Sequence, residues 1–120
     1  MNHLKILEIA QAWFAAFNNK NLEALLQLYA EDANHFSPKL KLRQPETGGW
    51  ISGKEALRKW WEDAFQRLPT LHYEIKTLTA NDERVFMEYQ REAEGEATQM
   101  IAEVLEISQG KIRSSRVYHG

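Results

Sequence analysis

Residues 22–38 (LEALLQLYAEDANHFSP) decide the fold of this chain. Apolar residues at positions 22, 25, 26 and 29 have the spacing of one helix face, which predicts a helix ending near Ala30. Residues 31–37 predict a strand, and Pro38 ends it because proline cannot donate to a sheet. A short helix that runs directly into a strand turns the chain sharply. We expect helix and sheet to enclose a pocket there.

Two more helices are predicted, one on each side of this stretch. Residues 4–18 carry an unbroken apolar stripe with three aromatic residues, and Asn21 is a good N-cap for the helix that follows. Ser52 and Glu55 form a capping box that predicts the start of a third helix. That helix keeps its apolar spacing as far as Leu68 and ends before Pro69.

The C-terminal half changes to a period of two. It predicts strands at residues 71–80, 84–92, 97–107 and 111–119, joined by short polar turns. Three helices followed by a long antiparallel meander indicate an α+β fold. A chain of 120 residues forms a single domain, residues 1–120, large enough for one hydrophobic core.

The segment between the first strand and the third helix has two interpretations. Residues 39–43 (KLKLR) alternate charge and leucine, which favours a half-buried edge strand whose lysines discourage pairing with another chain. The alternative is an edge that binds anions. Residues 44–49 form a loop with a Gly48-Gly49 turn, and Trp50 and Ile51 return as a short strand. This arm is placed to act as a lid on the pocket.

Composition excludes several function classes. The net charge of −2 gives no basic footprint for nucleic acid. The chain has no cysteine, and hence no disulfides or thiolate chemistry. Without a signal-like or membrane-spanning stretch, we expect a cytoplasmic protein. Four tryptophans, four tyrosines and five phenylalanines suit a core, and they also suit the walls of an apolar cavity.

Glu103 is the strongest candidate for chemistry because its predicted face is otherwise aliphatic. Alternate residues of a strand share a face, so Glu103 lies with Ile101 and Leu105. The same rule groups Arg116 and Tyr118 on the last strand, and we expect both to reach the space beside Glu103. Either Glu103 acts on a ligand, or it forms a purely structural pair with Arg116. A buried carboxylate must be paired or protonated in both cases.

The remaining candidates are weaker. His35, on the first strand, is a tentative second acid or base, and its alternative role is a core or rim histidine. No two histidines have the spacing of a metal site, so neither a metal nor a cofactor is expected. The expected wall of the pocket is aromatic and consists of Trp13, Phe17, Trp60, Trp61, Phe65 and Tyr89.

Three segments carry a resemblance to a known superfamily. AWFAAFNNKNLEALLQLYAEDANHFSP, SGKEALRKWWEDAF and GKIRSSRVYHG resemble the nuclear transport factor 2-like superfamily, which includes ketosteroid isomerases, SnoaL-like polyketide cyclases and limonene epoxide hydrolase. The resemblance spans nearly the whole chain. It implies a cone in which a curved sheet wraps helices around a deep pocket. It also implies a homodimer through the outer sheet face, at Phe86, Met100, Ala102 and Val104.

The sequence departs from ketosteroid isomerases at the catalytic positions. Ser37 stands where they carry the aspartate base, and Trp13 stands where they carry the oxyanion tyrosine. Only Glu103 matches a functional group, the acid that those enzymes keep protonated. Related cyclases carry an R-x-Y-x-D motif at this place, and here Gly120 replaces its final acid. Steroid isomerisation is therefore not expected.

The expected function is binding of an apolar or aromatic small molecule that bears an oxygen. If the protein is an enzyme, Glu103 or His35 serves as general acid or base in a cofactor-independent isomerase, cyclase or lyase reaction. The alternative is a non-catalytic ligand-binding or accessory dimerisation domain.

Overall fold

The structure is a computed structural model that describes residues 2–119. The chain begins with helices α1 (His3–Asn18) and α2 (Leu22–Gln27), which lead into strand β1 (Tyr29–Phe36). A short helix α3 (Pro38–Arg43), a 3-10 turn η1 (Pro45–Thr47) and strand β2 (Trp50–Ser52) precede helix α4 (Lys54–Arg67). Four long strands complete the chain: β3 (His72–Ala80), β4 (Arg84–Glu92), β5 (Gln99–Ser108) and β6 (Lys111–His119).

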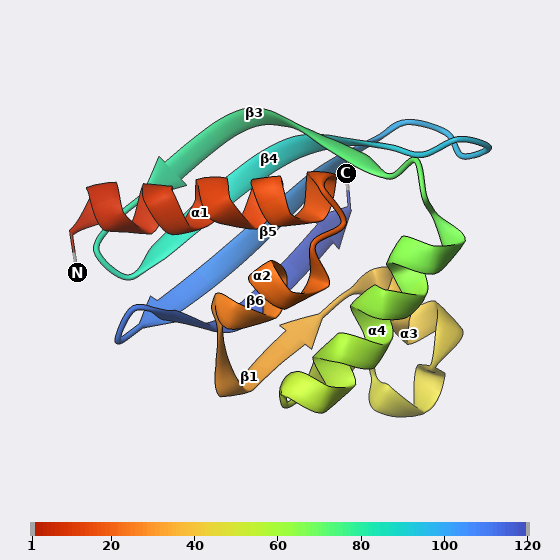
Figure 1. The fold of residues 1–120 in the computed structure, drawn as a ribbon, viewed down its shortest axis with the longest axis horizontal. Coiled ribbons are helices and arrows are strands. Elements are labelled where there is room, and N and C mark those ends of the chain that lie inside the picture. Colours follow the sequence, from red (N-terminus) through yellow and green to blue (C-terminus); the bar gives the residue numbers. More distant parts are fainter. Residues whose placement is uncertain (1, 120) are drawn as a thin grey trace.

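The six strands form one curled sheet in the order β2-β1-β6-β5-β4-β3. All neighbours are antiparallel except β1 and β6, which pair in parallel and join the N-terminal part of the chain to its last strand. In Figure 1, α1 runs along the sheet while α2 and α4 cover the region near β1. The predicted α+β cone is confirmed.

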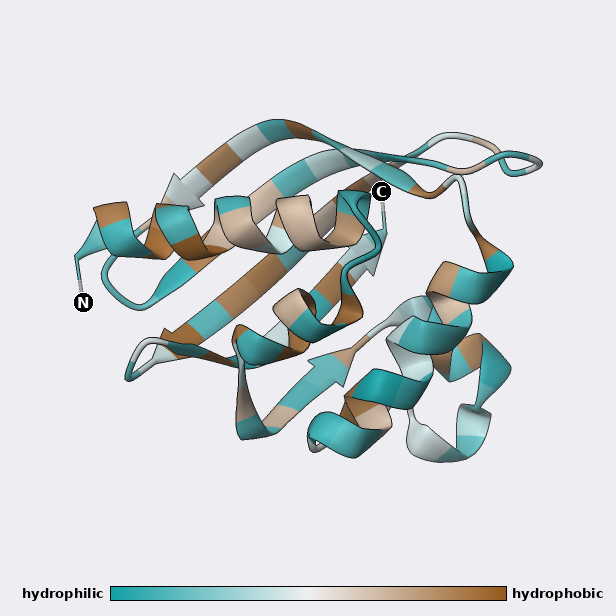
Figure 2. Ribbon diagram, viewed as in Figure 1, coloured by the Kyte–Doolittle hydropathy of each residue, from teal (hydrophilic) through white to brown (hydrophobic). Residues whose placement is uncertain are grey.

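The core lies between α1 and the concave face of the sheet. Figure 2 shows apolar and polar residues alternating along the strands, as expected for a sheet with one buried face. The stripe of α1 packs against this face through Ile6, Trp13 and Phe14, none of which is more than 2% exposed. Tyr29, which begins β1 directly after α2, is fully buried and fixes the corner between helix and strand.

Three local predictions were wrong. Residues 39–43 are helical, because Ser37 caps the helix by accepting from the backbone N–H of Lys39 and Pro38 occupies the first turn. The Ser52–Glu55 capping box does not form, since Ser52 belongs to β2 and Gly53, without a side chain, precedes α4. The second helix also ends earlier than Ala30, at Gln27, and β1 takes up residues 29 and 30.

An irregularity near the start of β6 changes which residues face the core. Ile112 is opposite Ile107, but the next pair joins Ser114 to Glu106, so the β6 strand contains one extra residue there. Beyond this bulge the inward residues are Ser115 and Val117. A one-residue slip reverses the faces of a strand, and the predicted inward face of residues 112–118 therefore holds only for its first part.

The outer face of the sheet carries exposed apolar side chains. Phe86 on β4 is 41% exposed and Met100 on β5 is 50% exposed, although both strands lie inside the sheet. Ala102 and Val104 are half-buried on the same part of β5. Within residues 2–119, no helix is both long and apolar enough to cross a membrane.

Candidate functional site

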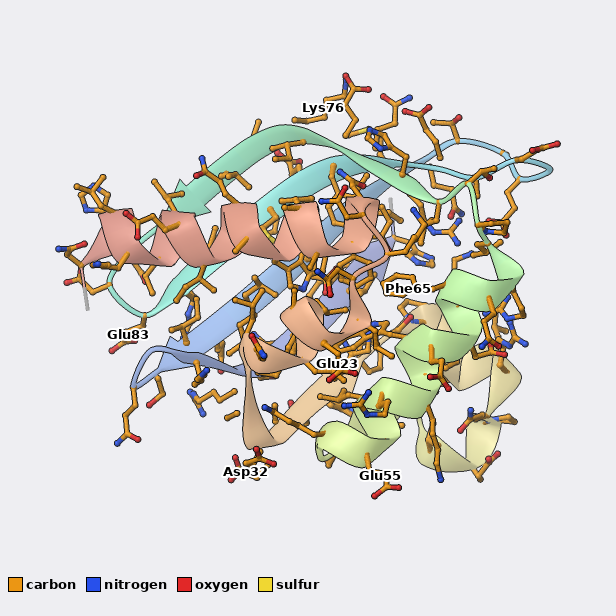
Figure 3. The ribbon with its side chains drawn as sticks, viewed as in Figure 1. Glu23, Asp32, Glu55, Phe65, Lys76 and Glu83 are labelled. Carbon is orange, nitrogen blue, oxygen red and sulfur yellow. The ribbon has the colours of Figure 1, made fainter. Side chains whose placement is uncertain are left out.

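A cavity of about 300 Å³ opens between the concave face of the sheet and helices α3 and α4. Its inner wall is built from β1, β4, β5 and β6, and α4 contributes Trp60 and Trp61 to the opposite wall. Figure 3 shows Phe65 near the end of α1, whereas the labelled residues Asp32, Glu55, Lys76 and Glu83 lie at the edge of the view. This size is at the lower end of the range for small-molecule sites.

Glu103 is the buried carboxyl group of this cavity. It lies on β5, is 1% exposed and accepts a hydrogen bond from the Tyr89 hydroxyl at 2.8 Å through Oε1. Its other oxygen, Oε2, is buried without a hydrogen-bond partner among residues 2–119. Burial raises the pKa of Glu103 to about 8, and the Tyr89 hydrogen bond offsets this only in part. At neutral pH most molecules therefore carry a protonated Glu103.

Aromatic packing holds the Tyr89 hydroxyl against Glu103. The Tyr89 ring lies 4.4 Å from the ring of Tyr73 and 5.4 Å from that of Phe14, centroid to centroid. Burial, followed by the nearby Glu103 carboxyl, raises the pKa of Tyr89 well above its ordinary value. Tyr89 therefore keeps its proton and remains a donor to Oε1, and Oε2 is the Glu103 oxygen without a partner among residues 2–119.

A second polar group, His35, stands at the end of a buried hydrogen-bond chain. The Trp13 indole N–H donates to the Tyr29 hydroxyl at 3.1 Å, and Tyr29 donates to Ser115 Oγ at 2.9 Å. Ser115 Oγ in turn lies 2.7 Å from Nδ1 of His35. The four residues come from α1, β1 and β6. The chain therefore ties the first helix to the floor of the cavity.

The direction of this chain favours one tautomer of His35. An indole nitrogen can only donate, so the Tyr29 oxygen accepts from Trp13, and the buried Tyr29 proton finds its acceptor in Ser115 Oγ. Ser115 then donates to Nδ1 of His35, and every buried proton in the chain has an acceptor. Burial lowers the pKa of His35 to about 4, and a hydrogen bond with the Ser115 backbone raises it only in part. His35 is therefore neutral at pH 7, and the chain predicts that its proton is on Nε2.

Six of the predicted residues line the cavity and four do not. Those that line it are Phe17, His35, Trp60, Trp61, Tyr89 and Glu103. Trp13 lies behind the wall, where its indole serves Tyr29 and its ring stacks 5.8 Å from Tyr73. Phe65 packs edge-on against Phe17 at 5.6 Å.

The expected placement of Arg116 and Tyr118 beside Glu103 was wrong. The extra residue in β6 turns both to the outer face, where Arg116 donates to Glu106 at 3.2 Å and Tyr118 is 48% exposed. Val117 is opposite Glu103 instead. A structural Glu103–Arg116 ion pair is therefore not formed, and Glu103 has no cationic partner within 4.0 Å among the described residues.

Several lining residues were missed by the sequence analysis. Tyr73 and Arg91 face the cavity, and Arg91 could have been found because it shares the face of Tyr89 two residues earlier. Lys39 lines the cavity because its segment is a helix, and His119 lines it because of the bulge in β6. Within residues 2–119, no three potential metal ligands of the His, Cys, Asp or Glu type lie together.

Comparisons with known proteins agree with the fold. The SnoaL-like domain family matches residues 10–115, and the chain belongs to this family. No curated protein matches the sequence significantly. Each of the solved structures described next is less than 25% identical to the chain, so they support the fold alone.

A SnoaL-like protein of unknown function from Burkholderia thailandensis is 22% identical with a TM-score of 0.88, covering 100% of this chain and 98% of that one. A nuclear transport factor 2-like protein from Anabaena variabilis is 20% identical with a TM-score of 0.79, covering 97% and 90%. A protein with a ketosteroid isomerase-like fold from Catenulispora acidiphila, solved with trimethylamine, is 23% identical with a TM-score of 0.75, covering 94% and 85%.

Proposed function

We propose that the cavity binds an apolar or aromatic small molecule with a carbonyl or hydroxyl oxygen, and that Glu103 acts on this oxygen as a general acid. The observation that carries the proposal is Glu103 Oε2, a buried carboxyl oxygen without a partner within residues 2–119. A protonated carboxyl group placed there is a hydrogen-bond donor in need of an acceptor. The aromatic walls provide the apolar surface for the rest of the ligand.

The chemistry follows from the raised pKa of Glu103. A group with a pKa of about 8 holds its proton at neutral pH, and its conjugate base is stronger than an ordinary carboxylate. Glu103 can donate its proton to the ligand oxygen, and the resulting carboxylate can take a proton from a neighbouring carbon. On a ketone this sequence forms the enol, and on an alcohol it eliminates water. Both are isomerase, cyclase or lyase chemistry.

His35 supports the same ligand from another wall. Strands β1 and β5 both flank β6, so they are separated by about 10 Å, twice the usual strand spacing. Its neutral ring presents Nε2–H and is a weak base, since its pKa is about 4. His35 is therefore assigned as a donor that orients a second acceptor of the ligand, and the acid–base role falls to Glu103.

The test uses α-tetralone, an aryl ketone with exchangeable protons on the carbon next to its carbonyl. Binding is measured by quenching of tryptophan fluorescence, and proton exchange is measured by NMR in D₂O. We expect the wild type to bind and to accelerate exchange. Glu103→Gln keeps an acceptor for Tyr89 and a donor for the ketone, so it should bind within about threefold of wild type but lose exchange by about a hundredfold or more.

Two outcomes decide against parts of this proposal. If the wild type binds α-tetralone without exchange, the protein is the non-catalytic alternative, a binding domain in which the polar groups only orient the ligand. If α-tetralone neither binds nor competes with any ligand extracted from the native protein, the cavity is not a ligand site. His35→Ala serves as a second variant and should weaken binding while leaving the pH dependence of exchange unchanged.

A further inference from the structure

Several cationic side chains line the mouth of the cavity. Lys39 and Arg43 come from α3, Arg67 from the last turn of α4, Arg91 from β4, and His119 from the end of β6. One carboxylate, Glu96 of the β4–β5 loop, lines the mouth with them. Elements far apart in the sequence thus bring four permanent cations and a histidine to one opening.

The carboxylates nearby do not balance these charges. Arg91 is 6% exposed and forms an ion pair with Glu96, whereas Arg43 and Arg67 share the single carboxylate of Asp63. Lys39 has no carboxylate within 4.0 Å in the described part of the chain. The whole chain has a net charge of −2, so the positive surplus is a local property of the cavity mouth.

The cations at the mouth also repel one another. The pKa of Lys39 is lowered first by burial and then by the Arg91 charge, with Glu96 acting in the opposite direction. The pKa of His119 is lowered by burial and then by Lys39 and Arg91. An apolar cavity concentrates such a field because its walls screen charge less than water does. An anion bound at the mouth would relieve this repulsion.

We propose that the natural ligand carries a carboxylate, which Lys39 and Arg91 hold at the mouth while the apolar, oxygen-bearing part extends toward Glu103. The inference deepens the proposed function and rests on it. Arg91 can offer a planar pair of N–H groups to a carboxylate, and Lys39 can approach as a second, mobile charge. Arg91 keeps its place through Glu96, so the site is partly formed before any ligand arrives.

The test compares naphthylacetate with naphthylacetamide, which have the same shape and differ in charge. Dissociation constants are measured by tryptophan fluorescence at low salt for the wild type, Lys39→Gln and Lys41→Gln. Lys41 is the matched control, since it lies on the same helix but is exposed and outside the cavity lining. We expect the wild type to bind the carboxylate about tenfold more tightly than the amide, the ratio that one charged hydrogen bond supplies.

The variants separate a built site from diffuse surface charge. Lys39→Gln should remove most of the preference for the carboxylate, and Lys41→Gln should leave it unchanged. Equal binding of carboxylate and amide by the wild type would overturn the carboxylate inference while leaving the proposed function intact. Equal loss in the two lysine variants would also overturn it. Failure of both probes to bind, together with failure of α-tetralone, would overturn the proposed function itself.

Discussion

Glu103 should contribute a loss of stability as pH rises, and Glu103→Gln should remove this contribution. Burial raises the pKa of Glu103 from 4.5 to about 8 in the folded protein. Between these two pH values the unfolded chain has lost the proton that the folded protein keeps, so rising pH favours unfolding. Below the lower value both states hold the proton, and the stabilising contribution is fully present. Above pH 8 the loss is complete.

The size of the effect follows from the two pKa values. Each pH unit in this window costs about 1.4 kcal/mol, which amounts to about 5 kcal/mol over the whole window. Because the side chain is 1% exposed, solvent screens little of this cost. Glutamine has nearly the same shape, remains neutral and still accepts from Tyr89. The variant should therefore lack this contribution, and the slope that His35 gives below its ordinary pKa of 6.5 is common to both proteins and cancels in their difference.

Urea denaturation of both proteins from about pH 5 to about pH 9 measures the difference directly. We expect Glu103→Gln to gain about 4 kcal/mol relative to wild type between pH 5 and pH 8. Glu106→Gln, on the outer face of the same strand, is the control. Burial raises the pKa of Glu106, but its arginine neighbours, of which Arg116 has the largest effect, lower it overall. Its difference from wild type should stay flat over this range. A flat difference for Glu103→Gln as well would refute a protonated, buried Glu103.

Three further predictions concern the hydrogen-bond chain, the outer face and the arm. Ser115→Ala should lower the free energy of unfolding by about 2 kcal/mol in urea denaturation, because the Tyr29 hydroxyl loses its acceptor. Nitrogen NMR of the wild type should find the His35 proton on Nε2. A proton on Nδ1 would contradict the direction of the hydrogen-bond chain. We propose that the outer face forms the homodimer that the resemblance implies. Phe86→Glu should convert it to a monomer in analytical ultracentrifugation, and a monomeric wild type would rule this dimer out. Gly49→Ala should cost about 2 kcal/mol, because φ is +95° and a Cβ would lie 2.6 Å from the Phe36 ring; unchanged thermal stability would show that the arm adapts.

The elements with a strong hydrophobic period could be predicted from the sequence. α1, α4 and the four C-terminal strands lie close to their expected bounds, and Glu103 lies on the buried face that its neighbours Ile101 and Leu105 indicate. The periodicity was decisive in these cases because one face of each element is buried in a single core. In residues 39–43 the alternation of lysine and leucine was misleading, and the Ser37-Pro38 helix start was the better signal.

The parts of the site that could not be predicted depend on contacts between distant residues. The bulge in β6 arises from pairing with β5, and it moved Arg116 and Tyr118 out of the site and His119 into it. The hydrogen bond between the Tyr29 hydroxyl and Ser115 joins residues 86 positions apart, and no local sequence pattern indicates it. The positive mouth likewise assembles from α3, α4, β4 and β6, so the composition of any one segment gives no sign of it.

A carbon NMR titration of the Glu103 carboxyl tests the central claim most directly. Glutamate labelled at its carboxyl carbon is incorporated, and Glu103→Gln identifies the signal by its loss. We expect a midpoint near pH 8. It should move higher when α-tetralone is bound, because a ligand oxygen that accepts a hydrogen bond from Glu103 stabilises the protonated form. A midpoint near the ordinary value of 4.5, unchanged by the ketone, would contradict a protonated Glu103 facing the ligand.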